Sequence, residues 1–98
     1  MILIKIHKTL NGDIIAMCDK DILGETFEDK NLRITASEQF YNGNELKNKE
    51  ELLKVLKNCS SLNILGKESV EFAIKNKIIG KENILKIKNI PHAIKIIT

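Results

Sequence analysis

The stretch from Ser60 to Lys77, SSLNILGKESVEFAIKNK, constrains the fold of this chain more than any other segment. Its short apolar run, Leu62–Leu65, lies between polar residues and predicts a buried strand. Gly66 then gives the backbone the freedom to turn sharply. From Lys67 onward, apolar residues recur at three- and four-residue steps, which predicts a helix. Strand-like segments precede and follow this stretch, so we expect a small α+β domain.

The beginning of the chain has the pattern of a β-hairpin. Isoleucines alternate with other residues over positions 2–7, which predicts a half-buried strand. Asn11-Gly12-Asp13 is a strong turn signal, because asparagine and glycine tolerate positive φ angles. The returning segment, Ile14–Cys18, is apolar at every position, so we expect it inside the sheet and covered on both faces.

The middle of the chain predicts one more strand and a second helix. Leu32, Ile34 and Ala36 alternate with polar residues, as in a strand, whereas residues 19–30 are polar and irregular. Residues 37–41 suggest a short helical turn or a bent strand. A helix is predicted over residues 49–58, with Asn48 as its N-cap.

The end of the chain predicts two strands joined by a turn. In the first, residues 83–88, we expect Leu85 and Ile87 to point inward and the lysines at 86 and 88 to point outward. Ile90-Pro91 is expected to turn the chain before a last strand at residues 93–97. Together, the elements predict a single domain over residues 1–98, with a largely antiparallel sheet, an N-terminal hairpin and two main helices.

Composition narrows the class of protein. Ninety-eight residues, 43% apolar and 30% charged, fit one folded domain. No apolar run approaches the ~20 residues that cross a bilayer, and the start lacks a signal-peptide pattern. We therefore expect a cytoplasmic protein with no membrane partner. The two cysteines, Cys18 and Cys59, form no CxxC pair and are expected to be buried free thiols.

The positive charge is concentrated near the end of the chain. Residues 81–98 contain four lysines and one glutamate, a surplus of 4 − 1 = +3, whereas the first 80 residues hold 12 basic and 12 acidic side chains. Such a surplus favours a basic face that binds nucleic acid or an acidic protein; the alternative is an ordinary solvated strand face. The candidate nucleic-acid-binding residues are Lys5, Arg33, Lys86, Lys88 and Lys95.

A second candidate site lies at the glycine turn. The helix N-terminus with Lys67 and Ser69 has free amide groups that suit a phosphate or carboxylate, although the full glycine-rich phosphate loop is absent and a plain turn is the alternative. His92 follows Pro91, shares strand parity with two isoleucines, and is either a ligand contact or a partly buried, hydrogen-bonded histidine. The possible ligand pocket therefore comprises Asn63, Gly66, Lys67 and His92.

The sequence contains no established catalytic or metal-binding motif. It has no HExxH, GxSxG or Walker pattern and no metal-spaced cysteine or histidine cluster. We therefore name no catalytic residue, no metal ligand and no cofactor, and expect a protein that is not an enzyme.

Four segments, in order, resemble a known family: DILGETF at residues 21–27, FYNG at 40–43, NILG at 63–66 and PHA at 91–93. The chain resembles domain of unknown function 424, an uncharacterised archaeal family, over nearly its whole length. The resemblance implies an archaeal lineage and a compact one-domain fold, and it hints at RNA binding or a role in translation. It supplies no catalytic residues but draws attention to Gly24, Asn63, Gly66 and His92.

Three functions follow from these patterns. The first is a small cytoplasmic protein that binds RNA or a ribonucleoprotein through a basic strand face. The second is a protein-interaction module, which an exposed apolar patch near Phe40, Tyr41 or the chain ends would favour. The third is an enzyme or small-molecule binder with a pocket near Asn63, Gly66 and His92.

Overall fold

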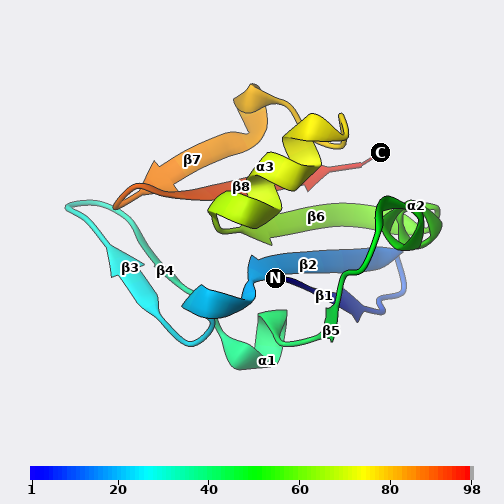
Figure 1. The fold of residues 1–98 in the computed structure, drawn as a ribbon, viewed down its shortest axis with the longest axis horizontal. Helices are drawn as coiled ribbons and strands as arrows, with labels where there is room; N and C mark the ends of the chain where they lie inside the picture. The colour runs from blue at the N-terminus through cyan, green and yellow to red at the C-terminus, as the bar shows by residue number, and fades with distance from the viewer. Residues whose placement is uncertain (98) are drawn as a thin grey trace.

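A six-stranded sheet forms the centre of the protein in the computed structural model, which describes residues 1–97 (Figure 1). The strand order is β5-β1-β2-β6-β8-β7, and β2 with β6 is the one parallel pair among these neighbours. The predicted α+β class with a largely antiparallel sheet is thus confirmed. The strands are β1 (Ile2–His7), β2 (Asp13–Asp19), β5 (Asn44–Glu45), β6 (Cys59–Leu65), β7 (Ile84–Ile87) and β8 (Ile90–Ile96).

Two helices cover one face of the sheet, which we call the helix side. They are α2 (Lys49–Leu56) and α3 (Lys67–Lys75), and Figure 1 shows α3 lying across β6 and β8. Both helices bury an apolar stripe against the strands, since Leu52 of α2 and Ala73 of α3 are fully buried in the same core as Met17 and Ile64. No helix within residues 1–97 is long and apolar enough to cross a membrane.

The opposite face of the sheet is only partly covered. The short helix α1 (Glu38–Tyr41) and the hairpin of β3 (Thr26–Glu28) and β4 (Arg33–Thr35) cover part of it. This second core contains Ala16, Cys18 and Leu65 from the sheet and Tyr41 from α1. Two 3₁₀ turns, η1 (Lys20–Ile22) and η2 (Lys81–Asn83), complete the described elements.

The predicted N-terminal hairpin and the strand–glycine–helix stretch are confirmed. β1 pairs with β2 across a turn that contains Asn11 and Gly12, and β2 is covered on both faces over residues 15–18, whereas Ile14 is only half-buried. The helix predicted over residues 49–58 is two residues shorter, and Asn48 caps it as expected, with Oδ1 3.0 Å from the Glu51 backbone nitrogen. Residues 26–28, predicted to be irregular, form β3. Both cysteines are free and buried.

The prediction for the end of the chain is wrong in two respects. The turn lies at Lys88-Asn89, where both residues have positive φ angles (51° and 66°), and Pro91 lies inside β8. A two-residue hairpin turn of this kind needs positive φ at both positions, and only the asparagine is a typical residue for it. Because β7 pairs with β8 in this register, Leu85 points to the partly covered face and is 50% exposed, not inward.

Candidate functional site

The uncovered part of the sheet is the most distinctive surface of the described chain. Strand register places Ile14, Ser61 and Ile96 side by side in one row, and Asn63 beside Ile94 in the next. The exposed fractions of Ile94 and Ile96 are 49% and 67%. We call this surface the open face; it comprises Ile14, Ser61, Asn63, Leu85, His92, Ile94 and Ile96.

A three-residue hydrogen-bond cluster lies where the covered and open parts of this face meet. The Tyr41 hydroxyl donates to Asn63 Oδ1 over 2.6 Å, and His92 Nε2 lies 2.9 Å from the same oxygen. Because an amide oxygen can only accept, the neutral imidazole carries its proton on Nε2 and keeps a lone pair on Nδ1. Within residues 1–97, no hydrogen bond is made by His92 Nδ1 or by the Asn63 amide nitrogen, so the cluster retains one free acceptor and one free donor.

Burial keeps this cluster neutral. It lowers the pKa of His92 and raises that of the Tyr41 phenol, in each case because the charged form would lose hydration. None of the seven residues of the open face has an acidic or lysine or arginine side chain. At neutral pH the surface is therefore uncharged, apolar at its margins and polar at one spot.

The lowered pKa of His92 makes the stability of the fold depend on pH. His92 has its ordinary pKa of 6.5 in the unfolded chain and a lower pKa in the folded chain. At a pH between these two values, the unfolded state therefore binds more protons than the folded state. The contribution of neutral His92 to the free energy of unfolding should therefore be fully present above about pH 6.5 and be lost as the pH falls through the folded pKa. Urea unfolding of wild type and His92→Gln between pH 8 and pH 5 measures this. A wild-type decline no steeper than that of His92→Gln would contradict it.

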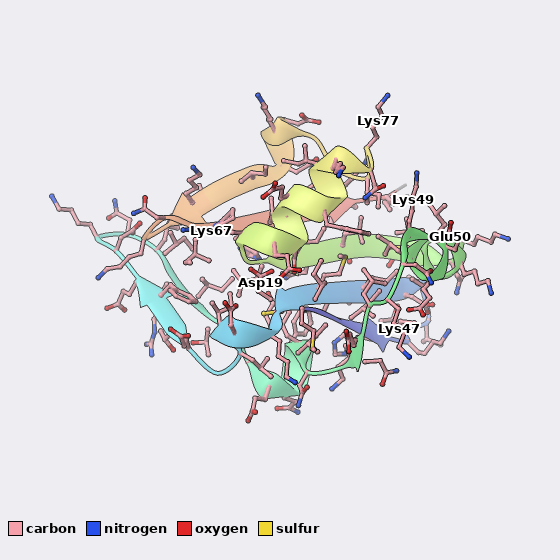
Figure 2. All side chains as sticks on the ribbon, in the orientation of Figure 1. Asp19, Lys47, Lys49, Glu50, Lys67 and Lys77 are labelled. Atoms are coloured by element: carbon pink, nitrogen blue, oxygen red, sulfur yellow. The ribbon has the colours of Figure 1, made fainter. Side chains whose placement is uncertain are left out.

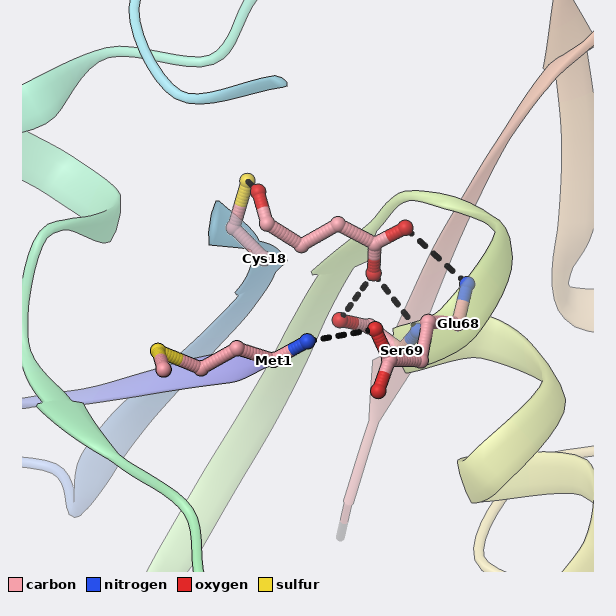
Figure 3. A network of polar contacts seen from close by, with 5 residues as sticks. Met1, Cys18, Glu68 and Ser69 are labelled. Carbon is pink, nitrogen blue, oxygen red and sulfur yellow. Dashed lines mark hydrogen bonds and ion pairs between the residues drawn. The ribbon is translucent and has the colours of Figure 1, made fainter. Parts of the chain in front are cut away.

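The predicted anion site at the start of α3 is filled by the protein itself. The carboxylate of Asp19 accepts hydrogen bonds from the backbone nitrogens of Glu68 (3.0 Å) and Ser69 (2.7 Å), and from the Ser69 hydroxyl (2.7 Å). Figure 2 shows Asp19 at the N-terminal end of α3, and Figure 3 shows these contacts at close range. The Met1 amino group reaches Glu68 Oε1 at 2.7 Å in the same network. The free amide groups that suggested a ligand site therefore act as a structural joint.

The four residues of the predicted ligand pocket fall into two groups. Asn63 and His92 are in direct contact through the cluster on the open face. Gly66 and Lys67 are at the start of α3, where the Gly66 N–H donates to the carbonyl of Pro91 over 3.0 Å. Lys67 lines a shallow cleft between α3 and β7 on the helix side, not the open face. Within residues 1–97, the two pairs are thus connected through the backbone, and neither Asn63 nor His92 lines the cleft that Lys67 lines.

The five candidate nucleic-acid-binding residues do not share a face. Lys5 projects toward α1 and donates to the carbonyl of Gln39, whereas Lys95 lies on the helix side and donates to the carbonyl of Ile78. Arg33 is on the β3–β4 hairpin, with Nε 3.8 Å from Glu28 Oε2. Lys86 is on the helix side of β7, the same side of the sheet as Lys95, whereas Lys88 is in the following turn.

Sequence reasoning missed Tyr41 and the exposed isoleucines as members of a site. Tyr41 was noted only as one of two adjacent aromatic residues, and it is in fact buried (3% exposed) with its hydroxyl directed at Asn63. The signal that could have found the open face was the lack of charge at alternate positions of the last strand. Within residues 1–97, no group of three or more histidine, cysteine or acidic side chains is placed to hold a metal ion.

Comparison with known proteins identifies the family. A model described as "Protein of unknown function (DUF424)" matches residues 6–97. The chain belongs to this family. The DUF424 fold is also seen in the crystal structure of an uncharacterized conserved protein from Methanopyrus kandleri, which is 22% identical, with a TM-score of 0.81 over 96% of this chain and 89% of that one. No curated protein matches the DUF424 chain in a sequence search.

Proposed function

We propose that this chain is a protein-binding module that uses the open face to dock its partner. The observation that carries the proposal is that the uncharged open face has three large apolar side chains, each about half exposed or more: Leu85, Ile94 and Ile96. Exposed apolar patches on a folded domain mark interaction surfaces. The central polar cluster adds direction, because a partner must match its donor and its acceptor.

RNA binding, the function expected first from the sequence, has less support. Nucleic-acid affinity depends on several basic side chains acting on one phosphate backbone. Here the five candidates lie on several faces, and two of them donate to backbone carbonyls within the described chain. A cytoplasmic site of action and an archaeal origin remain part of the proposal, as the sequence suggested.

An affinity capture with matched variants tests the proposal. Tagged wild type, Ile94→Glu and Leu53→Glu are used to recover partners from the source cells, with and without ribonuclease. Leu53 is the control because it is similarly exposed (45% against 49%) but lies on α2, on the helix side. We expect protein partners that survive ribonuclease, are lost with Ile94→Glu and are kept with Leu53→Glu, because a carboxylate cannot be buried there without a counter-charge.

Two outcomes contradict the proposal. Partners that disappear after ribonuclease would favour RNA or a ribonucleoprotein as the ligand. Partners that Ile94→Glu retains would show that the open face is not the docking surface.

A further inference from the structure

We propose that the partner docked on the open face is a second copy of this chain, related by a two-fold axis. This inference rests on the proposed function and names its partner. In a two-fold interface the same patch meets itself, so any contact from residue i to residue j is made twice. The open face must therefore be complementary to itself in hydrogen bonding, charge and shape.

Hydrogen bonding on the open face is self-complementary. Asn63 and His92 are hydrogen-bonded at Asn63 Oδ1. This leaves the Asn63 amide nitrogen as a donor and His92 Nδ1 as an acceptor. Across a two-fold axis, each Asn63 amide can donate to the His92 Nδ1 of the other copy, and the pair of bonds forms twice. Buried polar groups need such partners when a surface loses its water.

The charge distribution points to the same partner. The chain carries a net charge of +3, so two copies repel each other weakly overall. The open face has no acidic, lysine or arginine side chain, and burial favours the neutral imidazole of His92. Two copies that meet there bring no like charges into contact. A strongly acidic or basic partner would find no opposite charge on this surface.

The layer structure also permits this arrangement. The helix side of the sheet is already covered by α2 and α3, whereas no helix within residues 1–97 covers Ile94 and Ile96. Two sheet faces pack about 10 Å apart with interdigitating apolar side chains. A pair of chains would thus place both open faces in the middle and both helix layers outside.

Sedimentation equilibrium of the purified full-length chain tests the inference. We expect a species of twice the 11.1 kDa chain mass at concentrations of tens of micromolar. Ile94→Glu should weaken self-association by ~100-fold or more, because a carboxylate would lose its hydration in the apolar interface without a counter-charge. Leu53→Glu should leave it unchanged. Circular dichroism confirms that each variant is folded.

Amide chemical shifts recorded on dilution provide a second readout that needs no variant. Dissociation should shift signals of β6, β7 and β8 and leave those of α2 unchanged. A monomer at 100 µM, or a dimer that Ile94→Glu leaves intact, would overturn the second-copy inference. If the chain is monomeric but Ile94→Glu still abolishes capture of another protein, the proposed function stands without it; if capture is also unaffected, both fail.

Discussion

Replacing Asp19 by alanine is expected to lower the free energy of unfolding by about 3 kcal/mol, because the change leaves three donors without an acceptor. The two backbone N–H groups of Glu68 and Ser69 and the Ser69 hydroxyl all donate to this one carboxylate. Asp19 and Ser69 are almost fully buried, at 7% and 0% exposure, so water can replace the lost bonds only if the helix end opens.

Urea unfolding measures this effect. Asp21→Ala is the matched control, since Asp21 is an exposed acidic residue on the same segment with no hydrogen bond to α3 within the described residues. We expect the free energy of unfolding to fall by about 3 kcal/mol for Asp19→Ala and by no more than about 0.5 kcal/mol for Asp21→Ala. Equal effects of the two changes would mean that the joint between β2 and α3 contributes little to stability.

Replacing Gly66 by alanine should lower the free energy of unfolding by at least about 3 kcal/mol, for two reasons that add. The backbone there has φ +114° and ψ 154°, a conformation almost confined to glycine. A Cβ atom would also lie 2.6 Å from Asp19 Oδ2 and would therefore clash with the carboxylate that caps α3. The substitution therefore strains the turn and displaces the cap at once.

Gly24→Ala separates these two causes. Gly24 also has a positive φ, +90°, but nothing lies within 4 Å of the position its Cβ would take. Its substitution should cost only the backbone strain, about 1 kcal/mol. The double variant Asp19→Ala/Gly66→Ala should be less destabilised than the sum of the single changes, because the displaced group is gone. Additive losses, or equal losses for the two glycines, would contradict the proposed clash.

Local patterns in the sequence predicted the elements that depend on neighbouring residues. The N-terminal hairpin follows from a turn signal between two apolar segments, and the α3 stretch from a strand, Gly66 and a helical periodicity. The turn at Lys88-Asn89 escaped prediction because lysine is not a typical residue at positive φ, whereas Pro91 looked like a turn residue and lies in a strand. Leu85 was assigned inward because it alternates with lysines, and alternation alone does not say which face of the sheet is covered.

The candidate site could be predicted only in part, because it depends on strand order. Asn63 and His92 were selected from their places in the sequence, and they are in contact. That Tyr41 completes the cluster requires α1 to lie beneath β2, and this depends on the fold rather than on spacing. The anion site at α3 was predicted from its donors, but its occupant, Asp19, comes from 49 residues away along the chain.

The parallel pair β2–β6 joins two parts of the sheet, and within each part the paired strands are close together in the sequence. We call this pair the seam. β1 and β2 form one hairpin, whereas β6, α3, β7 and β8 follow one another directly in the second part. Bringing β2 to β6 closes a loop that spans residues 20–58, and the loop entropy is lost before the seam gains its contacts. We therefore expect the rate of folding to depend on this single closure, with the Asp19 carboxylate securing the seam only after β2 and β6 have met.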